Sequence, residues 1–265
     1  MDLILEKGTE ELFPEEIYAL LSNSGIWIEE KENHNIIKSY PKNIDTYLEC
    51  LKKLNIKIIK INIQKEEELD YADLTKKYFR PIKVDDITIL APWNKQDTKG
   101  NKIIIEPGMA FGTGRHESTK IMLKLMKMIN LASRNVLDLG CGSGILSLYA
   151  ALLDAKKVIA LDNDMDTVLS AKKNIILNNT DKISLLCTDL INVSGKYEVV
   201  LANLDIRTFT KLSEKIKGLI DNEGYIIISG ILNKEKKKLV SLLPTFDLIQ
   251  IEKKNSWCGF IFKKI

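Results

Sequence analysis

A nine-residue stretch, Val136-Leu-Asp-Leu-Gly-Cys-Gly-Ser-Gly144, decides the fold that we predict for this chain. A short apolar run leads into a glycine-rich turn, and the turn opens an apolar helical stretch. Glycines let the backbone approach a ligand closely, and the free N–H groups at a helix start point toward it. The dinucleotide fingerprint of dehydrogenases needs a third glycine where Ile145 stands, so that fingerprint fails. The stretch therefore predicts a strand, a ligand-binding turn and a helix of another α/β class.

Apolar runs alternate with helical stretches from about residue 118 onward. This alternation is typical of a mostly parallel sheet wound with helices. Toward the end of the chain only a short link separates the last two runs, which indicates a terminal antiparallel hairpin. The predicted strands are Val136–Leu139, Val158–Leu161, Ile183–Cys187, Val199–Ala202, Tyr225–Ser229, Phe246–Ile251 and Gly259–Phe262.

The first 64 residues predict a separate small domain. Their order of strand, helix, strand, strand, helix, strand matches the ferredoxin-like α+β plan. The first helix is expected to begin near Pro14 and to end at Gly25. The second is expected over Ile44–Leu54, with Ile44 and Leu51 on its apolar face. We therefore expect a ferredoxin-like domain over 1–64, a linker over 65–95 and the α/β domain over 96–265.

Composition predicts a soluble globular protein, because 45% of the residues are hydrophobic and 28% are charged. No apolar run approaches the ~20 residues of a membrane span. The acidic first residues do not resemble a signal peptide. The cysteines lie far apart, which predicts free thiols in a reduced cytosol and no metal site. They are Cys50, Cys141, Cys187 and Cys258. We expect a cytoplasmic protein without a membrane partner.

Charge is distributed unevenly along the chain. Residues 1–64 hold eight Lys and eleven Asp or Glu, a net charge of −3, whereas the whole chain carries +3. An acidic front end argues against a direct nucleic-acid contact there, because phosphates need cations. It suits a basic protein partner, and a solvated surface without a partner is the alternative. No feature of the sequence indicates an oligomer, so we expect a monomer.

Acidic and amide side chains follow the predicted strands at the sheet edge where ligands bind. Asp162 comes 22 residues after Gly140, where a ribose-binding acid belongs, although an Asp there can also cap a helix. Asp138 would lie near the positive amino-acid end of a ligand such as S-adenosylmethionine. Asp189 either meets an adenine edge or ends a turn. Asn203 would accept a hydrogen bond from an amine and aim its lone pair.

A second glycine-rich segment, Glu106–Thr119, reads Glu-Pro-Gly-Met-Ala-Phe-Gly-Thr-Gly-Arg-His-Glu-Ser-Thr. Its three glycines, Phe111 and several hydroxyl groups predict a rigid polar loop that folds over a bound cofactor. An ordinary loop is the alternative. His116 lies near the expected pocket, either as a base or as part of the loop's own structure.

These residues resemble the PrmA family, the methyltransferases of large-subunit ribosomal protein eleven. Glu106–Thr119 is similar to the family's stretch E/D-P-G-x-A-F-G-T-G-x-H-x-T-T, which is far more specific than the glycine turn. The resemblance covers nearly the whole chain, although the first domain matches in plan more than in residues. Further matching segments are Asp70–Val84, Ala91-Pro-Trp93, Ala202-Asn-Leu204 and Ser256-Trp257.

The resemblance implies a class I S-adenosylmethionine methyltransferase fold with S-adenosylmethionine as its cofactor. It implies cofactor contacts at Thr119, Gly140, Asp162 and Asn203, with Phe111 and the glycines around Thr113 closing over the cofactor, and Thr113 is counted with the cofactor-binding residues. We add Asp138 and Gly142 from the glycine turn, and we expect no metal. The first domain would recognise the ribosomal protein. The sequence departs from the family at Ser118, where Thr is commoner, and in the charges of Asp205 and Arg207.

The expected reaction is N-methylation of lysine side chains or of the N-terminal amine of that ribosomal protein, in its free form before ribosome assembly. Asn203 would orient the amine. It is followed by Leu-Asp-Ile rather than Pro-Pro-Tyr, which argues against planar amide or adenine nitrogens. The alternatives are a lysine methyltransferase for another protein, a methyltransferase for a small molecule or RNA, and a cofactor-binding module without catalysis. The acidic first domain disfavours RNA.

Overall fold

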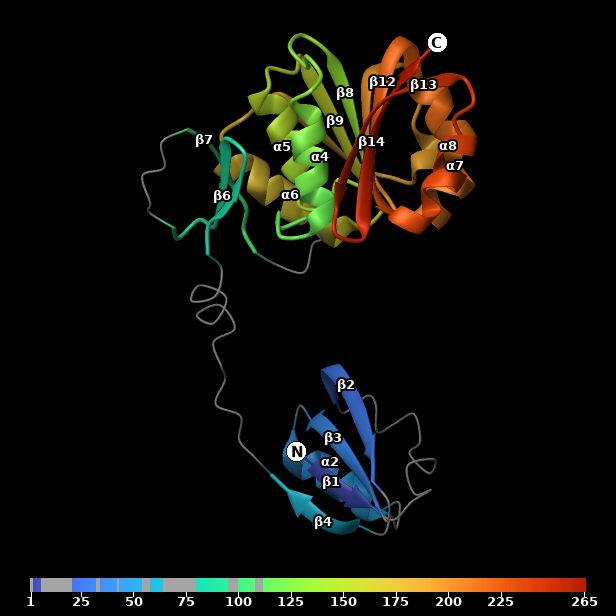
Figure 1. Cartoon of the computed structure of the whole chain (residues 1–265). Helices are drawn as coiled ribbons and strands as arrows, with labels where there is room; N and C mark the ends of the chain where they lie inside the picture. Colours follow the sequence, from blue (N-terminus) through green and yellow to red (C-terminus); the bar gives the residue numbers. More distant parts are fainter. Residues whose placement is uncertain are drawn as a thin grey trace. The chain divides into compact units, whose positions relative to one another are not determined.

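The computed structural model in Figure 1 describes residues 2–5, 21–31, 34–41, 43–53, 58–63, 80–94, 100–107 and 112–265; for 21–30 and 40 it describes the backbone alone. The chain divides into two compact units, Met1–Tyr71 and Ala72–Ile265. The predicted linker, 65–95, crosses this division, and its residues 82–84 and 87–90 form strands of the second unit. The bounds of the three predicted parts stay a prediction.

The described residues of the first unit form a four-stranded sheet and a helix. Its sheet order is β2-β3-β1-β4, with all described pairs antiparallel. The elements are β1 (Asp2–Leu5), β2 (Leu21–Glu30), β3 (Asn35–Pro41), α2 (Ile44–Lys53) and β4 (Ile58–Asn62). This is the strand order of a ferredoxin-like sheet. The start of the predicted first helix at Pro14 lies outside the described residues, so the ferredoxin-like assignment stays a prediction.

Two details of the first unit differ from the sequence-based expectation. Strand β2 already begins at Leu21, so a helix that continues to Gly25 is wrong. In α2, Tyr47 and Leu51 are buried, whereas Ile44 is 39% exposed. The helix therefore turns its Tyr47 side to the core, which Leu3, Leu5 and Ile37 complete.

The second unit is built on a seven-stranded sheet of order β10-β9-β8-β11-β12-β14-β13. The first five strands in this order are parallel, and β14 and β13 form the predicted antiparallel hairpin. The strands are β8 (Asn135–Leu139), β9 (Lys157–Asp162), β10 (Ile183–Cys187), β11 (Tyr197–Asn203), β12 (Ile220–Leu232), β13 (Phe246–Lys254) and β14 (Trp257–Lys264). The mostly parallel α/β sheet is confirmed.

Helices cover both faces of this sheet, and the alternation of side chains along the strands decides which residue faces which layer. On β11, Val199 and Leu201 pack in the core under α4 and α5, whereas Val200 and Ala202 pack under α7 and α8. The helices are α4 (Glu117–Met126), α5 (Ile145–Leu152), α6 (Met165–Leu177), α7 (Ile206–Leu219) and α8 (Lys236–Ser241), with short 3₁₀ turns η2 (Leu190–Asn192) and η3 (Asn233–Glu235).

A three-stranded sheet, β5-β6-β7, precedes α4 in the chain. Its strands are β5 (Ile82–Val84), β6 (Ile87–Leu90) and β7 (Asn101–Ile104). The side chains of Ile87, Ile89 and Ile103 are fully buried in the same core as α4 and α5. The small sheet therefore extends the α4–α5 side of the unit, as Figure 1 shows.

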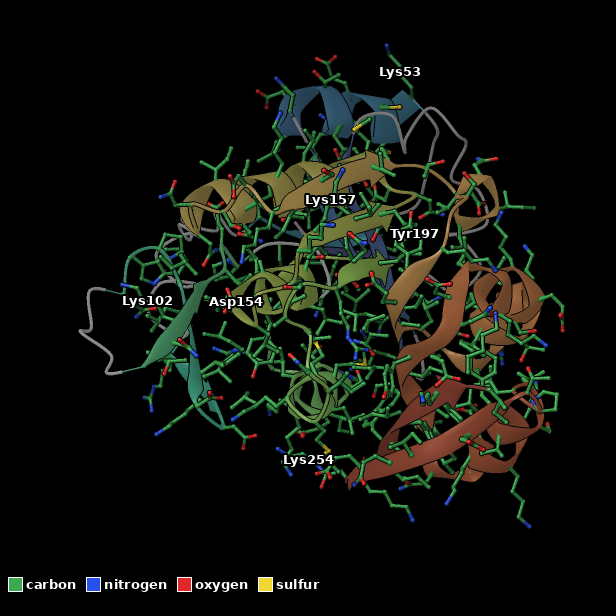
Figure 2. The ribbon with its side chains drawn as sticks, turned by 90° about the horizontal axis from the view of Figure 1, so that it is seen from above. Lys53, Lys102, Asp154, Lys157, Tyr197 and Lys254 are labelled. Carbon is green, nitrogen blue, oxygen red and sulfur yellow. The ribbon has the colours of Figure 1, made fainter. Side chains whose placement is uncertain are left out.

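The two edges of the large sheet differ in character. Lys157 and Tyr197, labelled in Figure 2, are the first residues of β9 and β11 and mark the amino edge. The opposite, carboxyl edge carries Gly140, Asp162 and Asn203, where β8, β9 and β11 end. Among the residues that the structure describes, no helix has the length and apolar character needed to cross a membrane.

Candidate active site at the carboxyl edge of the sheet

The glycine turn between β8 and α5 needs its glycines for conformational reasons. Gly140, Gly142 and Gly144 have φ angles of 65°, 55° and 79°, in the left-handed region that favours glycine. A Cβ on Gly140 would lie 3.1 Å from the Leu204 side chain. The turn is therefore tight, and it brings backbone N–H groups and the start of α5 to the carboxyl edge of the sheet.

Asp138 is a fully buried carboxyl group on β8, at the foot of this turn. The hydroxyl of Ser147 donates to its Oδ2 at 2.6 Å, whereas its Oδ1 has no hydrogen-bond partner. Burial raises the pKa of Asp138 to about 6; the charge of Asp162 adds to this rise, and the Ser147 hydrogen bonds oppose it. A buried carboxylate with an open oxygen is costly unless a cation meets it.

Asn203 and Thr119 offer two further open oxygen atoms. Asn203 ends β11 and its Oδ1 is inaccessible to water and without a partner. Thr119, in the first turn of α4, is fully buried, and its hydroxyl also lacks a partner. By strand alternation Asp138 and Asn203 both lie on the sheet face that α4 and α5 cover, so they share this layer with Thr119 of α4.

Asp162 stands where the sequence predicted it, at the last position of β9. Its Oδ2 accepts from the Gly142 N–H at 3.1 Å, and its Oδ1 accepts from the Asp164 N–H at 3.2 Å. The carboxylate thus holds the glycine turn. Each oxygen has a second lone pair, so these bonds leave acceptor capacity for another donor.

The segment before α4 lies against the glycine turn. The Ser143 hydroxyl donates to the Gly112 carbonyl at 2.7 Å. Gly112 and Gly114 have φ angles of 102° and 82°, and a Cβ on Gly114 would lie 2.4 Å from the Ile89 side chain. Thr113, between them, is half-buried. Phe111, predicted to close over the cofactor, lies outside the described residues.

His116 caps α4. Its Nδ1 accepts from the Ser118 N–H at 3.3 Å and lies 2.7 Å from the Ser118 hydroxyl. Its ring meets the Trp257 ring edge-on, with centroids 4.7 Å apart. Because Trp257 pairs with Leu232, at the carboxyl end of β12, the start of α4 lies at the same sheet edge as the glycine turn. Because Nδ1 is engaged in capping the helix, a structural role of His116 is favoured over a role as a general base.

Three other acidic groups near this edge stabilise helix starts. Asp189 caps η2, since its carboxylate accepts from the Ile191 N–H at 3.1 Å. Asp205 caps α7 through the N–H groups of Arg207 and Thr208, and the Thr208 hydroxyl is the main reason that its pKa is lowered. Glu117, in the first turn of α4, pairs with Lys254, labelled in Figure 2, at 3.1 Å.

Gly230, a residue that the sequence-based predictions do not include, shapes the carboxyl edge from β12. Its φ of 82° interrupts the pairing of β12 with β14, and the register shifts between Ile228 and Ile231. The backbone of Leu204 lies directly over it: a Cβ on Gly230 would be 2.6 Å from the Leu204 oxygen. A glycine inside a strand is the signal that could have revealed this bulge.

These residues fit S-adenosylmethionine, whose amino-acid end carries an ammonium group. The open oxygens of Asp138, Asn203 and Thr119 are acceptors in a dry layer, and such acceptors suit a cationic ligand. With the parallel sheet, the glycine turn and the terminal antiparallel hairpin, they define a class I S-adenosylmethionine-dependent methyltransferase.

Comparison with known proteins gives the family. The family model described as ribosomal protein L11 methyltransferase (PrmA) matches residues 3–265. The chain is 34% identical over 209 residues to the ribosomal protein L11 methyltransferase of Thermoanaerobacter sp. (strain X514), covering 77% of this chain and 68% of that protein. It is 32% identical over 263 residues to that of Campylobacter concisus (strain 13826), covering 96% and 94%.

A solved structure supports the same family assignment. The crystal structure of ribosomal protein L11 methylase from Lactobacillus delbrueckii subsp. bulgaricus matches with a TM-score of 0.67 and 26% identity, over 70% of this chain and 99% of that chain. The chain belongs to the PrmA family of ribosomal protein L11 methyltransferases.

Proposed function

We propose that this protein transfers methyl groups from S-adenosylmethionine to amino groups of ribosomal protein L11, at lysine side chains or the N-terminal amine. The observation that carries the proposal is the extent of the family match, which runs from residue 3 to residue 265 and so includes both units. Both relatives carry the name ribosomal protein L11 methyltransferase, and the match with the Campylobacter concisus protein covers 94% of its length.

The proposed cofactor site is the carboxyl edge of the large sheet. The buried, partnerless oxygens of Asp138, Thr119 and Asn203 support it, as does the hold of Asp162 on the glycine turn. Asp138 would meet the ammonium group, and Asp162 would accept from the ribose hydroxyls with its remaining lone pairs. The proposed cofactor-binding residues are Phe111, Thr113, Thr119, Asp138, Gly140, Gly142, Asp162 and Asn203.

When bound, S-adenosylmethionine supplies a methyl group on a cationic sulfonium, which is the electrophile. The chain must then deliver a neutral amine in line with it. A lysine with a pKa of ~10.4 needs about 4.6 kcal/mol to lose its proton at pH 7. A dry layer and a nearby cation both lower that cost, because they disfavour the ammonium form.

Asn203 is the proposed orienting residue. Its open Oδ1, at the end of β11, is an acceptor for one amine N–H and so fixes the direction of the nitrogen lone pair. The Asp205 carboxylate, two residues further on, accepts from the N–H groups of Arg207 and Thr208 at the start of α7, and the Asn203 Oδ1 stays without a partner.

The first unit is the proposed recognition domain, and the monomer is the proposed active form. Residues 1–64 carry a net charge of −3, which suits a basic partner and disfavours a direct nucleic-acid contact. A free substrate, before ribosome assembly, leaves its lysines open to an enzyme of this kind. Methylation of a newly made ribosomal protein would take place in the cytoplasm.

A transfer assay tests this proposal. Purified protein and S-adenosylmethionine are incubated with free L11, with L11 in assembled large subunits, and with a lysine-rich control protein; intact and peptide masses are then read. We expect added masses of methyl groups on free L11 alone. Equal modification of the control protein would support a broader lysine methyltransferase, and cofactor binding with no added mass on any protein would overturn the proposal.

A further inference from the structure

A buried asparagine links three separate segments around the glycine turn. Asn174, in α6, is fully buried. Its Nδ2 donates to the carbonyl of Ser143 at 2.8 Å, and its Oδ1 accepts from the N–H of Glu106 at 2.8 Å. One side chain therefore joins α6 to the glycine turn and to the start of the segment 106–119.

The same turn residue holds the other part of that segment. The Ser143 hydroxyl donates to the Gly112 carbonyl at 2.7 Å. A Cβ on Gly112 would lie 2.9 Å from the Ser143 hydroxyl oxygen, so the Gly112 backbone lies directly against the Ser143 side chain. The glycine turn is thus linked to Glu106 through Asn174 and to Gly112 directly.

Asn178, one turn further along the helix direction, makes a similar link without touching the glycine turn. Its Oδ1 accepts from the Ile104 N–H at 2.8 Å, and its Nδ2 donates to the carbonyls of Ile104 and Asn174 at 2.6 and 2.7 Å. It completes the hydrogen bonds of β7, which is an edge strand of its sheet. Asn178 is therefore a matched control for the loss of a helix-to-strand link.

We propose that Asn174 is a positioning residue for cofactor binding, which sets the spacing between the glycine turn and the backbone at Glu106. The proposal rests on the proposed cofactor roles of that turn and segment. Without the amide, the Ser143 carbonyl and the Glu106 N–H lose their partners in a dry environment, so the two backbones separate or admit water. The amide is needed in full, because one half donates and the other accepts.

Calorimetric titration with S-adenosylhomocysteine tests the role of Asn174 without any protein substrate. The proposed role of Asn174 can therefore prove wrong independently of the proposed substrate. We expect Asn174→Ala to weaken binding about 10- to 100-fold, and Asn178→Ala to weaken it less than about threefold. Asn174→Asp, which keeps the acceptor and loses the donor, has nearly the same shape and is the second variant if the alanine protein does not fold. It should bind as weakly as the alanine variant.

Hydrogen exchange of individual amides distinguishes a local effect of the substitution from a general loss of stability. In Asn174→Ala the amides of residues 112–114 should exchange faster at equal global stability, and in Asn178→Ala they should not. In a double-mutant cycle, Ser143→Ala and Asn174→Ala should be less than additive in cofactor affinity, because both release the same segment. Unchanged affinity in both Asn174 variants, or a loss that merely follows melting temperature in Asn174→Ala and Asn178→Ala alike, overturns the proposal.

Discussion

Asp138 and Asn203 lie on neighbouring parallel strands and face the same layer of the molecule. Leu201 is the register partner of Asp138, and Asn203 stands two residues beyond it on β11. Both carry an oxygen that is buried and has no hydrogen-bond partner. These two open acceptors, one pleat apart, lie with the Thr119 hydroxyl at the polar centre of the proposed cofactor site.

The acidity of Asp138 should be visible in the stability of the cofactor-free protein. Burial raises its pKa from 3.8 to about 6, so the folded protein binds this proton more tightly than the unfolded chain. Its contribution to the free energy of unfolding is therefore greatest at low pH and falls as pH rises from about 4 to about 6. Thermal unfolding across this range should show that fall in the native protein and lose it in Asp138→Asn.

Cofactor affinity should change with pH in the opposite sense, because the ionised carboxylate meets an ammonium group. The dissociation constant for S-adenosylhomocysteine should fall as pH rises through about 6. The Asp138→Asn variant should bind about 10- to 100-fold more weakly at pH 7, and its dissociation constant should not depend on pH in this range. An asparagine variant that binds as tightly as the native protein at pH 7 would remove Asp138 from the site.

Asn203→Ala should affect turnover more than cofactor affinity. The variant loses the acceptor that fixes the amine, so we expect kcat to fall about 100-fold, with the dissociation constant of the cofactor changed less than about tenfold. Asn203→Asp keeps an acceptor oxygen and should retain part of the turnover. Single-turnover kinetics and calorimetry separate the two effects. Full turnover and full affinity in Asn203→Ala would show that the orienting role is wrong.

Gly230→Ala should lower both stability and kcat, because it displaces the neighbouring segment that carries Asn203. A Cβ would lie 2.6 Å from the Leu204 oxygen, and the φ of 82° is unfavourable for any other residue. We expect a loss of about 1–3 kcal/mol in stability and a lower kcat, because the segment with Asn203 must move. Gly218→Ala is the matched control: it has open space and a helical position in α7, and should stabilise by about 0.5–1 kcal/mol. Similar kinetics in both variants would contradict this account of the bulge.

His116→Asn should leave catalysis intact, since asparagine also caps helices well. We expect kcat within about threefold of the native value and an unchanged pH profile, whereas His116→Ala should lose about 1 kcal/mol of stability. The pH dependence of single-turnover rates is the measurement. If His116→Asn instead abolished turnover and removed an ionisation from the profile, His116 would be a base after all.

The parts of the fold that local patterns specify were predictable. The apolar runs of the large sheet, the glycine turn of 140–144 and the terminal hairpin all depend on residues adjacent in the chain, and they are confirmed. The start of β2 at Leu21 was not predictable in this way, because strand pairing with Pro41 decides it. Ile44 was assigned to the core of α2 since its spacing fits, but Tyr47 takes that place.

The arrangement at the carboxyl edge was predictable where single positions follow strand ends, as with Asp162 and Asn203, and the cofactor roles of these residues stay a prediction. It was not predictable where a contact joins distant segments. Asn174 meets Glu106 across 68 residues, and nothing in the neighbourhood of either residue reveals the pair. The Leu204 backbone over Gly230 is likewise a tertiary contact. The open oxygen of Asp138 also depends on burial that only the packed layer creates.

The most direct test of the account is the mass of free L11 after incubation with this protein and S-adenosylmethionine, compared with Asn203→Ala under the same conditions. The account predicts methyl additions at lysines or the N-terminal amine with the native protein and a loss of about 100-fold in their rate with the variant. Native protein that binds the cofactor and adds no methyl group to L11 would contradict it.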